Sequence, residues 1–413
     1  MSSAPSTRPR LLIAGIVGNL LEWFDFAIYG FFAVTIGKLF FPVQDPVAQV
    51  ISAFGIFAIG FLMRPIGGVL LGYIGDKHGR HTAMLISVAA MAIPTFLVGV
   101  LPTYATLGIA APIILLILRM IQGLSVGGEY TTSVVYMVEN SPPSRRGFVG
   151  SFAVSGAVLG ILLGSSFGAL LATLLTADQL QAWGWRVPFW CGLVLGLSGL
   201  WLRRGDDSIA PHTPSTVNPL KTAWHDHRQV MLQVSGLAMV TAVVFYLVFV
   251  YVVSWLEMVD GIAPATALKI NSESMVLLIA VMLGSGWLSD RIGARPILMT
   301  STVLIVILAW PLFWLMHSTN DWSILAGQFG YALLIGAYLG AQPAYMVKVI
   351  PAAVRCTAAG LSYNITLGVA GGLSPMVATW LVHRTSDDLS PAFLIAVAAL
   401  VSWFAVRSLP KDA

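Results

Sequence analysis

The ten residues GYIGDKHGRH at positions 72–81 return as GWLSDRIGAR at positions 286–295, 214 positions further along the chain. Each copy ends a long apolar run and contains an acidic residue followed directly by a basic one. A second pair of loops, PPSRR at 142–146 and PAAVR at 351–355, repeats at an offset of 209 positions. Two matches at nearly one offset indicate that the chain consists of two similar halves.

The composition places both halves in a lipid bilayer. Of the 413 residues, 57% are hydrophobic and only 10% are charged, and the mean hydropathy is +0.84. A soluble domain carries about 25% charged residues, so this chain has too few to cover its surface and most of that surface must face lipid. Apolar runs of roughly 20 residues, the length that crosses a bilayer, predict twelve spans, at about 11–37, 50–74, 82–101, 110–138, 148–175, 185–203, 231–256, 268–289, 296–316, 323–347, 356–382 and 390–408.

The predicted fold class is an all-α membrane protein of twelve transmembrane helices in two six-helix bundles. An N-terminal bundle at 1–203 and a C-terminal bundle at 231–413 are joined by a polar linker at 204–230. Because the repeated loops lie on the same side of the membrane, a pseudo-twofold axis along the membrane normal relates the halves. That arrangement allows one half to rock against the other.

Basic residues determine the predicted orientation. Of the 22 Lys and Arg residues, 16 fall in segments on the side of the N-terminus, four fall on the opposite side and two lie inside spans. By the positive-inside rule both termini are cytoplasmic, which an even number of spans permits. The run at 11–36 is too long for the core of a signal peptide and contains two acids, so it is expected to remain as the first span.

Ionisable residues inside the spans are the strongest functional signals in the sequence. A charge at mid-span costs roughly 2.5–3.5 kcal/mol, so it needs a partner or a water-filled cavity. The first span carries Glu22 and Asp25, one helical turn apart, and the fourth carries Glu129. Ionising both acids of the first span is repulsive, so at least one is expected to hold a proton. These three acids are the candidate proton-coupling residues; the alternative is a structural network with neighbouring helices.

Two buried arginines are the candidate cations for binding a substrate. Arg64 lies about 15 Å from the end of the second span at 1.5 Å per residue, near the midplane, and Arg119 shares a helix face with Gln122. The guanidinium fork matches a carboxylate. Each arginine either binds the substrate or serves as the permanent partner of an acid, and the sequence leaves both interpretations open. Two uncharged residues, Gln122 and Tyr29, join the candidate substrate-binding site; Tyr29 lies on the same face of the first span as Glu22.

The second half has no comparable buried arginine. Its candidate substrate-binding residues are uncharged: Tyr251 in the seventh predicted span, Tyr338 and Gln342 in the tenth, and Asn364 in the eleventh. Such donors would complete a site formed mostly by the first half. For each of them, a role in helix packing or at the lipid interface is an equally good interpretation.

Several segments resemble a known family of transporters. The loop at 72–80 looks like the hallmark loop of the major facilitator superfamily. More narrowly, four segments resemble its metabolite:proton symporter family: GNLLEWFDFAIYG at 18–30, FLMRPIGG at 61–68, RMIQGLSVGGEY at 119–130 and WGWRVPF at 183–189. That family includes carriers of α-ketoglutarate, citrate, shikimate, and proline or betaine. The second-half loop departs from the pattern, because Ala294 stands where arginine is expected.

The resemblance implies gating roles for the two repeated loops. These roles would fall to Gly72, Asp76 and Arg80 in the first half, and to Asp290 and Arg291 in the second. Such residues would close the cytoplasmic side through salt bridges and helix ends. The alternative is that the loops only orient the chain by their positive charge. A topology signal needs no acid, so the recurrence of the acid in the second loop favours gating.

The sequence therefore favours a secondary transporter in a bacterial inner membrane. The main hypothesis is proton-coupled symport of a small organic acid, a mono-, di- or tricarboxylate, by alternating access. The alternative is proton-coupled symport of an osmoprotectant such as proline or glycine betaine. The expected partners are a small carboxylate or zwitterion, protons as the coupling ion and the lipid bilayer, and the protein is expected to be a monomer.

Other functional classes find little support in the sequence. It has no Gly-Lys-Ser/Thr phosphate loop and no catalytic Ser/His/Asp arrangement, so neither ATP drive nor an enzyme is predicted. The histidines lack metal-ligand spacing, no cofactor is expected, and Cys191 and Cys356 are interpreted as small apolar residues rather than a disulfide. A tandem repeat with asymmetric buried charge suits alternating access better than a channel. Basic loops explain the isoelectric point near 9.1 without any nucleic-acid partner.

Overall fold

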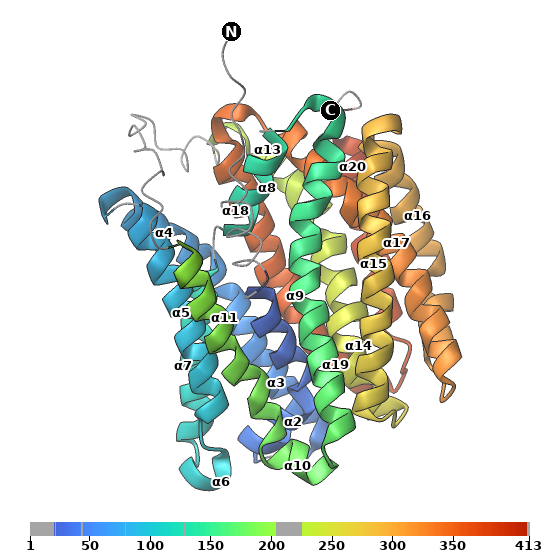
Figure 1. The fold of residues 1–413 in the computed structure, drawn as a ribbon. Helices are drawn as coiled ribbons and strands as arrows, with labels where there is room; N and C mark the ends of the chain where they lie inside the picture. The colour runs from blue at the N-terminus through green and yellow to red at the C-terminus, as the bar shows by residue number, and fades with distance from the viewer. Residues whose placement is uncertain are drawn as a thin grey trace.

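The computed structural model of the chain describes residues 20, 22–42, 44–78, 80–126, 129–139, 141–203 and 225–410, which form long helices and no strand (Figure 1). Eight of the described helices are long and apolar enough to cross a bilayer. The helix Glu22–Phe31 and α2 (Ala33–Phe40), bent by 67° at one residue, form a ninth candidate span. Two shorter apolar helices, Leu85–Val100 and Ala110–Ser125, and α11 (Val187–Arg203) complete the twelve predicted spans.

The helices fall into two groups along the chain. The first half continues with α3 (Pro46–Leu62), α4 (Arg64–His78), α5 (Arg80–Val100), α6 (Tyr104–Leu107), α7 (Ala110–Ser125), α8 (Glu129–Glu139), η1 (Pro143–Arg145), α9 (Arg146–Leu174), α10 (Ala177–Ala182), η2 (Gly184–Arg186) and α11. The second half contains α13 (Arg228–Leu237), η3 (Val240–Val244), η4 (Leu247–Tyr251), α14 (Val252–Val259), α15 (Pro264–Ile292), α16 (Ala294–Met316), α17 (Asp321–Val349), η5 (Ala352–Val354), α18 (Arg355–Thr366), η6 (Leu367–Gly371), α19 (Gly372–Thr385) and α20 (Pro391–Ser408). Residues 204–224 of the predicted linker lie outside the described part.

Local sequence signals explain where helices begin and end. The side chain of Asp45 accepts a hydrogen bond from the Val47 N–H and caps α3, whose first residue is a proline. Between α15 and α16, Gly293 has φ +87°, a conformation that a residue with a side chain rarely adopts. This glycine belongs to the repeated loop, so the loop's tight turn depends on it.

Two spans of the second half are interrupted by π-helical turns. In the seventh span, η3 and η4 separate α13 from α14, and in the eleventh, η6 separates α18 from α19. Such turns release backbone groups, which other side chains must satisfy inside a membrane. Both the Tyr338 hydroxyl (2.7 Å) and the Gln342 amide nitrogen (2.9 Å) donate to the carbonyl of Leu237, just before η3.

The two halves touch at both ends of the bundle. At the predicted external end, which holds α6 and α10 (Figure 1), the Ser165 hydroxyl donates to the Leu268 carbonyl over 3.1 Å. At the predicted cytoplasmic end, Asp290 of the second half accepts hydrogen bonds from the backbone of α9. In this conformation, therefore, the two halves contact each other at both ends of the bundle.

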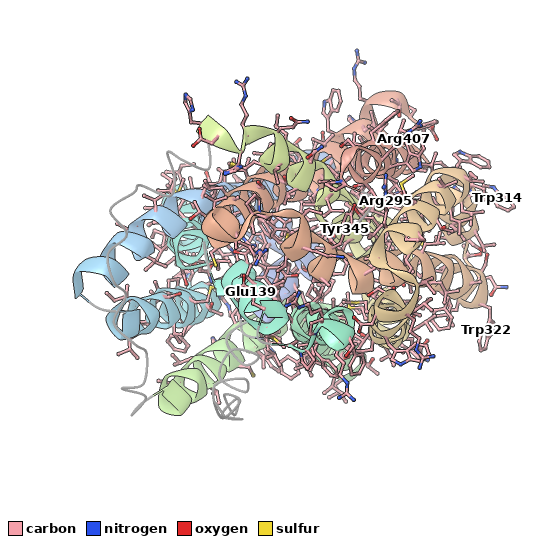
Figure 2. The ribbon with its side chains drawn as sticks, turned by 90° about the horizontal axis from the view of Figure 1, so that it is seen from above. Glu139, Arg295, Trp314, Trp322, Tyr345 and Arg407 are labelled. Atoms are coloured by element: carbon pink, nitrogen blue, oxygen red, sulfur yellow. The ribbon has the colours of Figure 1, made fainter. Side chains whose placement is uncertain are left out.

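The outer surface is apolar, as a lipid-facing surface must be. Large hydrophobic side chains that are more than half exposed occur on helices of both halves, including Ile109, Leu174, Val194, Ile307 and Phe393. Trp314 and Trp322, at the predicted external end, point away from the bundle in the view from above (Figure 2). Tryptophan is enriched at membrane–water interfaces, so these two residues mark one boundary of the bilayer. The predicted all-α membrane fold is confirmed.

Candidate functional site

The buried charges of the first half form two ion pairs. Arg64 of α4 lies 3.5 Å from Glu22, measured from Nη2 to Oε1, and Arg119 of α7 lies 2.8 Å from Asp25, measured from Nη1 to Oδ2. All four side chains are at most 7% exposed. Both acids come from the first helix, yet each pairs with a different arginine. The two pairs therefore differ in their surroundings and must be considered separately.

The Arg119 pair belongs to a tight hydrogen-bond network within the first half. The Gln122 amide nitrogen donates to Asp25 Oδ2 over 3.0 Å and to the Thr95 hydroxyl over 2.8 Å. The Arg119 guanidinium lies 4.0 Å above the ring of Tyr29, whose hydroxyl donates to the carbonyl of Ala53. A charge-assisted bond of 2.8 Å with a further donor on the same oxygen is a strong arrangement. Arg119 still has two buried nitrogens, Nε and Nη2, without a hydrogen-bond partner among the described residues, so the two pairs differ in the length of the ion-pair contact and not in the number of unfilled donors.

The Arg64 pair is looser. Its 3.5 Å separation exceeds the 2.7–3.2 Å range of an N–H···O hydrogen bond. The Nε and Nη2 atoms of Arg64 are buried and have no hydrogen-bond partner among the described residues. The guanidinium instead lies over aromatic rings, 4.0 Å from the centroid of Phe61 and 4.7 Å from that of Phe26. Arg64 thus retains donors that a carboxylate could fill.

Aromatic side chains of both halves surround the Arg64 pair. Trp23 and Tyr130 of the first half and Phe245, Tyr246 and Tyr363 of the second form what we call the central aromatic cluster. The Trp23 ring lies 6.2 Å from that of Tyr130 and 6.3 Å from that of Tyr246, and the Tyr130 and Tyr363 rings stack at 5.2 Å. The hydroxyl of Tyr246 and the indole nitrogen of Trp23 are buried, and neither has a hydrogen-bond partner in the described part of the chain.

A small cavity of about 20 Å³ lies at this cluster. Its walls come from both halves and include Trp23, Tyr130, Thr241, Phe245 and Tyr363. Tyr246 and Tyr363 are also close enough to both members of the Arg64 pair to interact with them electrostatically. The central aromatic cluster therefore connects the two halves beside Arg64, whose contact with Glu22 is the longer of the two ion pairs.

The predicted substrate-binding residues of the second half lie around the cluster rather than in it. Gln342 reaches the cavity indirectly, because its amide oxygen accepts a 2.7 Å hydrogen bond from Thr241. Tyr251 is fully buried, with its ring centroid 6.1 Å from that of Phe54 and its hydroxyl near Thr379. Asn364 donates to the carbonyl of Gly360 in its own helix. Their roles in binding stay predictions.

Sequence reasoning missed the central aromatic cluster. Trp23 and Tyr130 lie inside segments that resemble the symporter family, each directly after an acid, and that adjacency was an available signal. Tyr246 and Tyr363 offered no signal, because they lie in spans without charges and aromatic residues are common in such spans.

The second-half copy of the repeated loop, for which a gating role was predicted, contacts the first half. Asp290 accepts hydrogen bonds from the backbone N–H groups of Gly147 (2.7 Å) and Phe148 (2.9 Å), at the start of α9. An acid is favourable there because the first N–H groups of a helix lack partners and carry partial positive charge. A Cβ atom at position 147 would lie 2.5 Å from the carbonyl oxygen of Gly286, so only glycine permits this approach.

The second predicted gate residue of this loop, Arg291, and the nearby Arg355, which was not among the predicted gate residues, differ in what they contact. Arg291 lies 3.7 Å from the ring of Trp287 in its own helix and does not join the halves. Arg355 of α18 forms an ion pair with Glu139 of α8, which does join them. The side chains at four predicted positions, Gly72, Asp76, Arg80 and Glu129, lie outside the described part of the structure.

Comparisons with known proteins agree with this architecture. Residues 15–375 match the Major Facilitator Superfamily. The proline/betaine transporter of Salmonella typhimurium is 34% identical over 98% of this chain and 84% of its own length, and that of Escherichia coli K12 is 35% identical over 95% and 81%. A glycine betaine/proline/ectoine/pipecolic acid transporter of Dickeya dadantii is 35% identical over the same shares.

Solved structures support the fold independently. The crystal structure of a D-xylose-proton symporter superposes with a TM-score of 0.76 at 18% identity, covering 96% of this chain and 98% of the other. A partially occluded, inward-open structure of the xylose transporter of E. coli gives 0.75 at 17% identity, covering 98% of each chain. At such low identity only the fold is shared. Taken with the family match and the curated relatives, this establishes that the chain belongs to the Major Facilitator Superfamily.

Proposed function

We propose that this protein is a proton-coupled symporter of small zwitterions that combine a carboxylate with a substituted ammonium, such as proline and glycine betaine. The named relatives favour this alternative over the organic-acid hypothesis. In this proposal the protein lies in the bacterial inner membrane with both termini in the cytoplasm, as the positive-inside rule predicts.

The observation that supports the proposal most is the position of Arg64 beside the central aromatic cluster. A guanidinium with unfilled donors suits a carboxylate. Aromatic faces suit an ammonium group that carries methyl or ring carbons, through cation–π attraction. One end of a zwitterion would therefore meet Arg64 and the other would meet rings such as Trp23 and Tyr363.

Charge balance favours a zwitterion as well. Arg64 and Glu22 together are neutral, and a zwitterion by itself adds no net charge, so the coupled proton is the one charge that the site gains. A dicarboxylate would add two negative charges to a buried site, which needs further cations to offset the cost of desolvation. Arg119 already neutralises Asp25 at 2.8 Å and is not free to supply that charge.

The same geometry suggests how a proton is coupled to the substrate. The substrate carboxylate competes with Glu22 for Arg64. When the substrate takes Arg64 from Glu22, the ionised form of Glu22 loses the stabilisation by that cation in an apolar site, so Glu22 binds a proton more readily. Substrate and proton therefore favour each other's binding, which is reciprocal coupling. Asp25 keeps its partner throughout.

Transport currents test the proposal directly. With purified protein in proteoliposomes, glycine betaine with one proton carries one positive charge, worth about 2.3 kcal/mol per 100 mV. We expect an inward current that grows with interior-negative voltage and with external acidity. A monocarboxylate carried with one proton would give uptake without current. Uptake of radiolabelled succinate or lactate in place of betaine and proline would overturn the zwitterion assignment.

The aromatic cluster gives a second prediction. Trp23→Leu is expected to raise the KM for glycine betaine by roughly 3- to 30-fold, because it removes a cation–π contact worth about 0.5–2 kcal/mol. Trp23→Phe keeps an aromatic face, and losing the indole nitrogen breaks no hydrogen bond among the described residues. The Phe variant should therefore stay near the wild-type KM. Equal KM values in the two variants would argue against an aromatic contact with the ammonium.

A further inference from the structure

The internal repeat relates residues near the cytoplasmic end of the first half to equivalent residues in the second half. At one of these equivalent positions the first half has an acid and the second half has a base. The offset of 209 positions relates Arg146 to Arg355 and Glu139 to Lys348. Arg355 of the second half pairs with Glu139 of the first. The symmetric contact would join Arg146 of the first half to an acid at position 348, but position 348 is a lysine.

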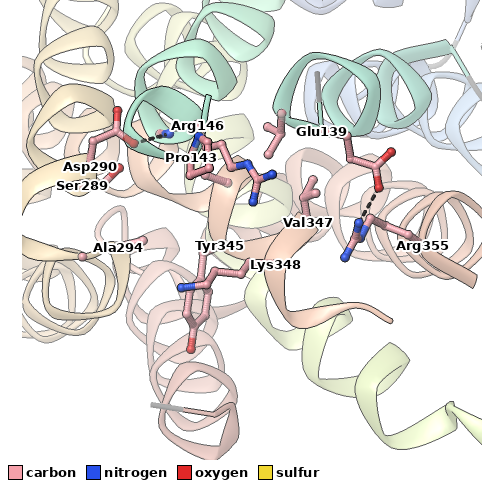
Figure 3. Close-up of a pocket in the computed structure, with 14 residues that line it drawn as sticks. Glu139, Pro143, Arg146, Ser289, Asp290, Ala294, Tyr345, Val347, Lys348 and Arg355 are labelled. Atoms are coloured by element: carbon pink, nitrogen blue, oxygen red, sulfur yellow. Dashed lines mark hydrogen bonds and ion pairs between the residues drawn. The ribbon is translucent and has the colours of Figure 1, made fainter. Parts of the chain in front are cut away.

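A cavity of about 370 Å³ lies between the halves at this place (Figure 3). Its lining includes Arg146 at the start of α9 and Lys348 near the end of α17, so each half contributes one cation. Neither cation has an ion-pair partner among the residues that the structure describes.

The acids that line the cavity are already engaged. Asp290 accepts two backbone hydrogen bonds from α9, and Glu139 is paired with Arg355. Figure 3 shows the Glu139–Arg355 pair to one side of Arg146 and Lys348. The lining therefore carries three cations, Arg146, Lys348 and Arg355, against two acids, a net charge of +1. Arg146 and Lys348 lie on opposite sides of the interface, so closure of this end brings two cations without ion-pair partners among the described residues toward each other.

We propose that this cavity binds a phosphate group, which takes the place of the missing carboxylate at position 348. A phosphate has several acceptor oxygens, so it can accept from the guanidinium fork of Arg146 and from the ammonium of Lys348 at once. Because the two cations come from different halves, the bound phosphate holds them together only when this end is closed. It therefore shifts the equilibrium toward the conformation closed at this end.

Two sources offer this chemistry at a membrane surface: free inorganic phosphate and the phosphodiester of an anionic lipid. Binding of phosphate at this end does not depend on which solute the protein carries. The phosphate acts as a regulator of the conformational equilibrium rather than as a substrate.

The test measures how often this end is closed. Nitroxide labels at Ser144 of η1 and Ala352 of η5, one in each half, in a background with Cys191→Ser and Cys356→Ser, report the distance by pulsed electron resonance. One arm adds inorganic phosphate to nanodiscs of phosphatidylcholine at constant ionic strength. The other arm replaces part of the phosphatidylcholine by phosphatidylglycerol without added phosphate. We expect at least a threefold rise in the closed-to-open ratio in one arm, which identifies the source.

Variants at position 348 make the test specific. Lys348→Glu restores the symmetric ion pair, so it should be closed without phosphate and unresponsive to it. Lys348→Gln removes the phosphate contact and the repulsion together, so it should be unresponsive to phosphate and at least as closed as the wild type without it. Arg384→Gln removes a positive charge from an exposed site at the other end of the bundle and should respond as the wild type does. No response of the wild type in either arm, or an undiminished response of Lys348→Gln, would overturn the proposal.

Discussion

Replacing Arg64 by glutamine is expected to reduce kcat/KM for glycine betaine uptake by about 30-fold or more while leaving the protein folded. Removing one partner of a buried, hydrogen-bonded charge pair costs about 2–5 kcal/mol, and here the lost partner is the substrate carboxylate. Glu22, left without its cation, can bind a proton instead, so the fold does not retain an unpaired charge. Uptake in proteoliposomes and the midpoint temperature of unfolding measure the two effects separately.

Arg64→Lys is the matched control for that experiment. It keeps the positive charge but loses the planar fork, so uptake should fall between those of the wild type and of the glutamine variant. If the glutamine variant transported glycine betaine at nearly the wild-type rate, Arg64 would have no contact with the substrate carboxylate. If the glutamine variant failed to fold, the 3.5 Å contact between Arg64 and Glu22 in the wild type would be required for the structure despite its length.

The sequence predicted which charges are buried but not how they pair. Glu22 and Asp25 are three positions apart in one helix, so both face the same region, and two arginines were available as partners. The pairing depends on the rotation of α4 and α7 about their axes, which apolar length does not determine. The difference between a 2.8 Å contact and a 3.5 Å contact follows from packing across helices, for which a single sequence holds no signal.

The sequence predicted the number of spans and the internal repeat, but it did not predict where the helices inside the spans are irregular. The repeated loops at 72–81 and 286–295 led correctly to a two-bundle architecture in this superfamily. The π-helical turns η3, η4 and η6 were missed, because their residues are as apolar as those of a regular helix. These turns depend on contacts with other helices, such as the close approach of Gly368 to the Phe61 carbonyl across the interface.

Arg119→Gln is expected to have the opposite signature to the Arg64 variant, with a large loss of stability. Asp25 is 1% exposed and would lose its charged partner, which costs about 3–5 kcal/mol when a buried ion pair is broken. Only the Gln122 amide would still donate to it. We expect a clearly lower midpoint temperature of unfolding in detergent and poor yields of purified protein.

The double variant Asp25→Asn/Arg119→Gln is the decisive comparison, because it removes both charges and leaves two neutral groups of similar size. It should regain most of the lost stability, since replacing both partners of a buried pair is far less costly than removing one. If its uptake were still coupled to protons, Glu22 would remain the candidate carrier and Asp25 would not be required. A stable Arg119→Gln single variant that cannot transport would instead assign the substrate carboxylate to Arg119, and the competition between substrate and Glu22 for Arg64 would have to be abandoned.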